Sequence, residues 1–135
     1  MILQAPIEDA TMCFACGRDN PIGLQIQFTL DDDGRCHGLF TPGPNHVGYE
    51  NTVHGGIIYA ALDDVMANVL YLSQRKAHTA RCEIRYRQPL EIGQTVRLLG
   101  SVVNERRRLL QLEGEARRIA DDAVIATCDA SFMLA

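Results

Sequence analysis

The apolar residues at the start of this chain of 135 residues alternate with polar ones. In residues 23–30 (GLQIQFTL), every second side chain is apolar, which is typical of a strand with one buried face. The turn-forming sequence DDDG follows at residues 31–34, and residues 35–42 have the character of a second strand. Together they predict a β-hairpin. A loop rich in proline, glycine and asparagine follows at residues 42–51.

The pattern changes in residues 57–72, where nearly every side chain is apolar. A helix at the surface shows one apolar stripe, whereas a helix that is apolar on all sides has to be surrounded by protein. Two aspartates and Asn68 interrupt the segment, which argues against a membrane span. The pattern therefore predicts a long central helix.

Four strand-like segments follow the helix, separated by turn-forming sequences at residues 91–94, 106–108 and 120–122. A hairpin, one helix and a meander of four strands indicate the α+β class. We expect an antiparallel sheet of about six strands wrapped around the central helix. Residues 1–135 are expected to form a single domain, with residues 1–12 as a loosely ordered N-terminal arm. The four strands are expected at residues 77–86, 95–105, 109–119 and 123–134.

Composition narrows the classes of function. The formal net charge of −4 argues against a nucleic-acid surface. The arginines at 106–108 and 117–118 fit either a solvated turn and strand edge or a contact for a small phosphorylated ligand. The N-terminal sequence does not have the pattern of a signal peptide. Five cysteines, an odd number, then favour reduced thiols and a cytoplasmic location.

The two adjacent aspartates have different neighbours on a helix that turns by about 100° per residue. Asp64 shares a side with Asn68, which suits a hydrogen-bonded residue at the boundary of the core. Asp63 has small and apolar neighbours, and an ionised carboxylate is costly to bury there without a partner. Asp63 is therefore a candidate functional carboxylate, and the alternative is a buried carboxylate that backbone amides or a second subunit satisfy.

The sequence His54-Gly55-Gly56 precedes the helix. Free N–H groups in the first turn, together with the positive end of the helix dipole, can hold a carbonyl oxygen that gains negative charge. At 1.5 Å per residue, Gly55 and Asp63 are about 12 Å apart on one helix, too far to contact one carbonyl group. Either the two groups have different tasks, or antiparallel helices of a dimer bring Gly55 of one chain to Asp63 of the other, which we favour.

Cys13 and Cys16 form a Cys-x-x-Cys pair. A zinc site needs four ligands, and no second pair of cysteines or histidines at metal-binding spacing follows in the sequence. We therefore expect a packed turn and no metal site. Cys82 and Cys128 alternate with apolar strand positions, which indicates core residues.

Three segments in this order resemble the hotdog-fold acyl-CoA thioesterases of the PaaI-like type, named after the phenylacetate pathway. They are CFACGRDNPIGLQIQF, HVGYENTVHGGIIYAALDD and IRYRQPLEIGQTV, at residues 13–28, 46–64 and 84–96. The resemblance extends from Cys13 to the C-terminus. It implies a thioester hydrolase that acts on acyl-CoA without a cofactor or metal. It also implies a homodimer or a homotetramer built as a dimer of dimers, with no nucleic-acid or membrane partner.

The resemblance also implies roles for individual residues. Asp63 corresponds to the carboxylate that activates water or attacks the thioester, and Gly55 to the N–H group that polarises its carbonyl. His54 would support the loop, and Thr79 would help to place the water. Some relatives use a polar loop residue at the position of Gly48, a role that His46 or Asn51 could take. The expected substrate-binding residues are Gly56, His46, Asn51, Tyr59, Arg81 and Arg85, the arginines as partners for phosphates of coenzyme A.

Two other functions remain open. The chain could bind an acyl-CoA without cleaving it, as a sensing protein would. It could also be a hotdog hydratase or dehydratase, although the spacing of His54 and Asp63 fits that chemistry less well than it fits hydrolysis.

Overall fold

The structure is a computed structural model that describes residues 9–135, so residues 1–8 of the predicted N-terminal arm lie outside the described part. It contains one α-helix, one short 3₁₀ helix and six strands within those residues. In chain order the elements are β1 (Phe28–Leu30), β2 (Cys36–Phe40), η1 (Pro44–His46), α1 (Gly55–Tyr71), β3 (Ala77–Tyr86), β4 (Val96–Arg106), β5 (Leu109–Arg118) and β6 (Val124–Leu134).

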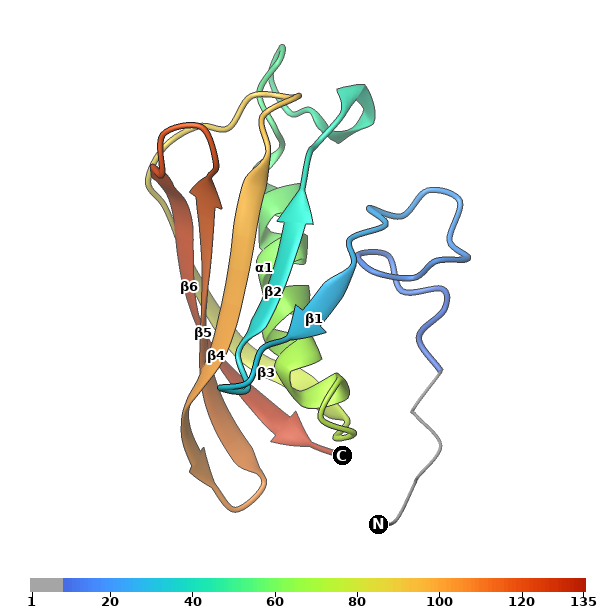
Figure 1. Cartoon of the computed structure of the whole chain (residues 1–135), viewed down its shortest axis with the longest axis vertical. Coiled ribbons are helices and arrows are strands. Elements are labelled where there is room, and N and C mark those ends of the chain that lie inside the picture. Colours follow the sequence, from blue (N-terminus) through green and yellow to red (C-terminus); the bar gives the residue numbers. More distant parts are fainter. Residues whose placement is uncertain (1–8) are drawn as a thin grey trace.

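The six strands form one antiparallel sheet in the order β1-β2-β4-β5-β6-β3. Helix α1 runs along one face of this sheet and contacts every strand (Figure 1). The predicted α+β fold with one long central helix is therefore confirmed. Among residues 9–135, no helix has the length and apolar character needed to cross a membrane.

The core lies between α1 and the sheet. The helix contributes seven buried apolar side chains, which at 100° per residue lie within about half of its circumference, on the side that faces the sheet. The other half, which includes Ile57, Ala60 and Ala67, is only partly buried in the single chain, so burial on all sides is not observed here. Fully burying one of the larger side chains is worth about 1.5–3 kcal/mol relative to leaving it exposed. The seven buried residues are Ile58, Ala61, Leu62, Val65, Met66, Val69 and Leu70.

The first predicted strand is wrong over most of its length, because only Phe28–Leu30 of residues 23–30 pairs with β2. Gln25 has a positive φ of 59°, which interrupts an extended strand. The N–H groups of Leu24 and Ile26 donate instead to carbonyl groups in the preceding loop. Leu24 and Ile26 are nevertheless buried. The alternation therefore predicted the buried positions correctly, but the expected hydrogen bonds to a neighbouring strand are not formed there.

Two glycines allow α1 to lie close to the middle of the sheet. Gly100 in β4 is paired with Gly114 in β5, directly beneath the helix. A Cβ atom at Gly100 would be 2.8 Å from the carbonyl oxygen of Val65, and one at Gly114 would be 3.2 Å from the side chain of Met66. The distance between helix and sheet thus depends on the absence of these two side chains.

We therefore expect Gly100→Ala to destabilise the protein by about 1–3 kcal/mol, since the added methyl group meets helix backbone that cannot rotate away. Urea unfolding gives the free energy directly. Gly43→Ala is the matched control, because a Cβ atom there has open space and φ is −115°. Equal stability of Gly100→Ala and the unsubstituted protein would contradict this account of the packing.

Candidate active site

The first candidate site lies at the N-terminus of α1. His54 is the N-cap residue, and its Nδ1 accepts a hydrogen bond of 2.8 Å from the N–H of Gly56. This bond fixes the neutral tautomer of His54 with the proton on Nε2. The N–H of Gly56 is consequently occupied.

Gly55, one residue earlier, has a different role in the helix start. No acceptor for its N–H lies within the described residues, and its carbonyl oxygen accepts a hydrogen bond of 2.7 Å from the hydroxyl of Tyr86. A Cβ atom at Gly55 would be 3.3 Å from the Tyr86 ring. The free N–H at the positive end of the helix dipole can therefore donate to a ligand oxygen.

A cavity of about 280 Å³ opens at this helix start. Gly55 and Ile58 from α1, Tyr86 from the end of β3 and Leu90 from the following loop line it. The sequence had not indicated Tyr86 as a functional residue. A tyrosine as the last residue of a strand is a weak signal of function as long as it is unknown which element the strand packs against.

The second candidate site is Asp63, about two turns further along α1. Its Oδ1 accepts a hydrogen bond of 2.7 Å from the hydroxyl of Thr79 in β3. The Asp63 carboxylate is partly buried and Thr79 is exposed, so the pair lies at the surface of the helix–sheet boundary. A carboxylate oriented in this way can act as a base or a nucleophile.

A β-bulge explains why Thr79 faces the helix. In an uninterrupted strand, Thr79 and Tyr86 would point to opposite faces, because their numbers differ by an odd number. The pairing of β3 with β6 shifts by one residue between Thr79 and Arg81. The shift returns Thr79 to the inner face, opposite the fully buried Phe132.

Tyr59 lies between the two candidate groups and belongs to a small polar cluster with two cysteines. The Sγ atoms of Cys82 and Cys128 are 3.0 Å apart on the neighbouring strands β3 and β6. Interaction with Cys82 is the largest of the influences that raise the pKa of Tyr59, and burial and the charge of Asp63 act in the same direction. Tyr59 therefore retains its proton and remains a hydrogen-bond donor.

The loop before the helix holds the remaining predicted residues of this region. The carbonyl oxygen of His46 accepts a bond of 2.8 Å from the N–H of His54, and its Nδ1 accepts one of 2.9 Å from Gly43. The structure therefore brings His46 to the helix start. Asn51 has a positive φ of 60° and its carbonyl oxygen accepts a bond from Ile92, which makes it part of the loop framework.

The two predicted phosphate partners lie elsewhere. Arg81 and Arg85 are exposed on the face of β3 that points away from α1, and both are within ion-pair distance of Glu83, at 3.6 and 3.8 Å. The structure therefore does not bring them to Asp63 or to the helix start within one chain.

Strand β3 forms one edge of the sheet, and none of its ten residues is buried. An edge strand of this length offers a row of unpaired backbone groups to another chain. The strand also carries Thr79 and Tyr86, so any chain that covers this edge approaches both candidate sites.

One group of metal-ligating side chains occurs within residues 9–135. Cys13, Cys16 and Asp64 have ligand atoms within 4.8 Å of one another. Asp64 points to a different side of α1 from Asp63, so this cluster is separate from the candidate active site.

The model of one protein family, the Thioesterase superfamily, matches residues 50–125, which include α1, Asp63 and Thr79. Because the match covers more than half of the chain, the protein belongs to this superfamily. No curated protein matches the sequence.

Solved structures resemble the fold. A thioesterase superfamily protein is 24% identical, with a TM-score of 0.82 over 88% of this chain and 61% of the other. This chain thus spans less than two thirds of that protein. A hypothetical thioesterase from Streptococcus pneumoniae with coenzyme A is 13% identical, with a TM-score of 0.75 over 82% and 85% of the two chains. The PaaI protein of the phenylacetic acid degradation operon of E. coli is 17% identical, with a TM-score of 0.76 over 83% and 80%. The hotdog fold is confirmed.

Proposed function

We propose that the protein hydrolyses acyl-CoA thioesters, with Asp63 as the general base or nucleophile and the N–H of Gly55 as the oxyanion donor. The observation that supports the proposal most is that α1 carries both a free N-terminal N–H donor and a carboxylate oriented by Thr79. Both groups lie in the part of the chain that the superfamily model matches.

The hydrolysis needs few groups, because a thioester is already an activated acyl compound. In the general-base form, Asp63 takes a proton from water, and the water oxygen attacks the carbonyl carbon. The N–H of Gly55 donates to the carbonyl oxygen as it becomes negative. The carbon–sulfur bond then breaks, and the thiolate of coenzyme A takes up the proton that Asp63 had accepted, which leaves a carboxylic acid, the free thiol and an ionised Asp63. The proposed reaction uses no metal and no cofactor.

The two groups require a second chain. On one helix, Gly55 and Asp63 are about 12 Å apart at 1.5 Å per residue, whereas catalytic contacts are close to 3 Å. An antiparallel arrangement of two α1 helices would place Gly55 of each chain beside Asp63 of the other. The free edge of β3 and the absence of buried residues along it support a homodimer formed at this edge. A homotetramer would pair two such dimers.

Two features of the pneumococcal protein support this assignment. Its structure contains coenzyme A, and its other structures carry an aspartate or a threonine replaced by alanine. Those two residues are separated by the same number of positions as Asp63 and Thr79 here. We propose that Asp63 and Thr79 act together in this protein.

The proposed binding residues divide by location. Gly56, His46, Asn51 and Tyr59 lie along α1 and its preceding loop, where they could contact the acyl group and the pantetheine arm. Arg81 and Arg85 lie on the outer face of the edge strand, so they would reach phosphates of coenzyme A only from that side. All five cysteines are free thiols, which agrees with the proposed cytoplasmic location.

A panel of aromatic, short-chain and long-chain acyl-CoA esters tests the proposal through release of the free thiol. We expect turnover of at least one class. Binding of acyl-CoA by calorimetry without thiol release would contradict hydrolysis and favour the acyl-CoA-binding alternative. Hydration of an enoyl-CoA without thiol release would favour a hydratase.

A further inference from the structure

Cys13, Cys16 and Asp64 come together although 51 positions separate the first from the last. The two cysteines lie in the loop before β1, and Asp64 projects from the middle of α1. The Sγ of Cys13 is 3.6 Å from Oδ1 of Asp64. Two ligands bound tetrahedrally to zinc, at about 2.3 Å for sulfur and 2.0 Å for oxygen, lie about 3.5 Å apart. The observed separation of 3.6 Å is close to one edge of a tetrahedral zinc site, and all three ligand atoms lie within 4.8 Å of one another.

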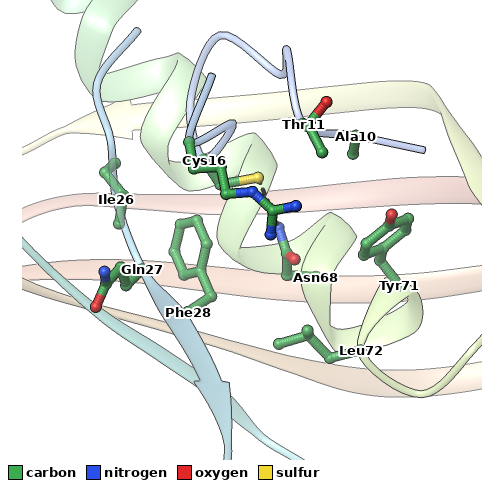
Figure 2. A pocket seen from close by; sticks show the side chains of 10 residues that line it. Ala10, Thr11, Cys16, Ile26, Gln27, Phe28, Asn68, Tyr71 and Leu72 are labelled. Atoms are coloured by element: carbon green, nitrogen blue, oxygen red, sulfur yellow. Dashed lines mark hydrogen bonds between the residues drawn. The ribbon is translucent and has the colours of Figure 1, made fainter. Parts of the chain in front are cut away.

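The loop that carries the cysteines is a tight turn. The N–H of Gly17 donates to the carbonyl oxygen of Cys13 over 2.8 Å. A Cβ atom at Gly17 would be 2.6 Å from that oxygen, so only glycine permits the close return of the chain. This turn directs both thiols toward α1, and Figure 2 shows the thiol of Cys16 beside Asn68.

Asn68 orients the aspartate. Its side-chain N–H₂ donates to Oδ2 of Asp64 over 3.1 Å and to the backbone carbonyl oxygen of Asp64 over 2.9 Å. Oδ1 thus remains directed at the cysteines. An outer hydrogen bond that fixes one carboxylate oxygen and leaves the other for a cation is a usual feature of metal sites.

We propose that Cys13, Cys16 and Asp64 bind one zinc ion, with water as the fourth ligand, in a site separate from the proposed active site. Binding would release the protons of the two thiols to solvent, and the resulting thiolates and the carboxylate would carry three negative charges around the divalent ion. The fourth position would face a cavity of about 140 Å³ beside the three ligands.

All three ligand residues are partly buried, and a cation would compensate the charge of the Asp64 carboxylate there. Arg75 and Lys76 line the same cavity, but each forms an ion pair with an acidic residue, Glu105 and Asp9 respectively. Two thiolates and a carboxylate favour zinc over magnesium or calcium, which prefer oxygen ligands alone.

The zinc ion would connect the loop before β1 to the central helix. The hydrogen bonds between these cysteines and α1 are weak: the Cys13 thiol donates to Asp64 over 3.6 Å, and Asn68 donates to the sulfur of Cys16 over 3.8 Å. A bound ion would stabilise the folded chain in proportion to its affinity, because the unfolded chain does not keep the three ligands together.

Cobalt titration of the full chain, reduced and freed of metal by a chelator, tests the site without relying on a variant. We expect one Co²⁺ per chain, with the visible bands of tetrahedral cobalt and a near-ultraviolet thiolate band, and displacement of the cobalt by Zn²⁺. The absence of these bands in reduced protein would overturn the proposal, whether or not Cys13 and Cys16 form a disulfide in air.

Variants identify the ligands. Cys16→Ser and Asp64→Asn should each weaken Zn²⁺ binding by at least about 100-fold, since loss of a ligand exceeds the 10–100-fold cost of losing an outer hydrogen bond. Cys82→Ser is the matched control, a partly buried cysteine elsewhere, and should bind zinc like the unsubstituted protein. Unchanged affinity in folded Asp64→Asn, or equal loss in Cys82→Ser, would overturn the three-ligand site.

Discussion

Asp63→Asn is expected to lower kcat for acyl-CoA hydrolysis by about 10³-fold, which lies within the 10²–10⁴-fold range for the loss of a general base. The amide has nearly the same shape as the carboxylate, and its oxygen can still accept the hydrogen bond from Thr79 that is observed at 2.7 Å. The fold should therefore be preserved while the base or nucleophile is lost. Thiol release at saturating substrate measures the effect.

Asp129→Asn is the matched control, since Asp129 is exposed on β6 and its strand partner is Glu83 on the outer face of the sheet. It should leave kcat unchanged. The thermal unfolding temperatures of both variants should differ little from that of the unsubstituted protein. Turnover by Asp63→Asn at the level of this control would contradict the catalytic role of Asp63.

Gly55→Pro is expected to lower kcat by about 10²–10³-fold relative to Gly55→Ala, which is the usual effect of removing one oxyanion donor. Proline lacks the N–H group but is well tolerated at the first position of a helix, where Gly55 lies. The preceding residue must be extended before a proline, and His54 already is, with φ −61° and ψ 133°. Removal of a single donor is therefore compatible with an intact helix.

Gly55→Ala separates the effect of the side chain from that of the donor. Both variants place a Cβ atom 3.3 Å from the Tyr86 ring, but only the alanine keeps its N–H. Equal activity of the two variants would show that the N–H of Gly55 does not contact the substrate.

The same two substitutions test whether the site spans two chains. In a mixed dimer of Asp63→Asn and Gly55→Pro chains, one of the two sites would combine the intact Gly55 of one chain with the intact Asp63 of the other. Random mixing gives half mixed dimers, so about a quarter of full activity should return. No recovery in dimers shown to be mixed would contradict a site that Gly55 of one chain and Asp63 of the other form together.

The sequence predicted the elements of this fold well, because the apolar pattern reflects burial. The central helix and the four later strands lie within a few residues of their expected positions. The exception is residues 23–27, where Leu24 and Ile26 are buried but bond to a neighbouring loop. Alternation reports which face is buried and contains no information on the hydrogen-bond partner.

The contacts within the candidate site were harder to predict from the sequence than the fold. The pairing of Thr79 with Asp63 depends on a bulge, and simple alternation would place Thr79 and Tyr86 on opposite faces of β3. The hydrogen bond from Tyr86 to Gly55 joins residues 31 positions apart. Likewise, the sequence shows no third metal-ligating residue next to the Cys-x-x-Cys pair, whereas the fold brings the carboxylate of Asp64 within 4.8 Å of both thiols. Such long-range contacts follow from tertiary packing.

The glycine pair beneath the helix limits how the protein can accommodate a large ligand. Val65 and Met66 rest on the strands at Gly100 and Gly114, and both are fully buried. No chamber can open below α1 without separating the two layers and moving Asp63 away from Thr79. In the proposed reaction, a bulky acyl group would therefore extend along the side of α1 that faces away from the sheet, and substitutions on that side would alter the preferred chain length.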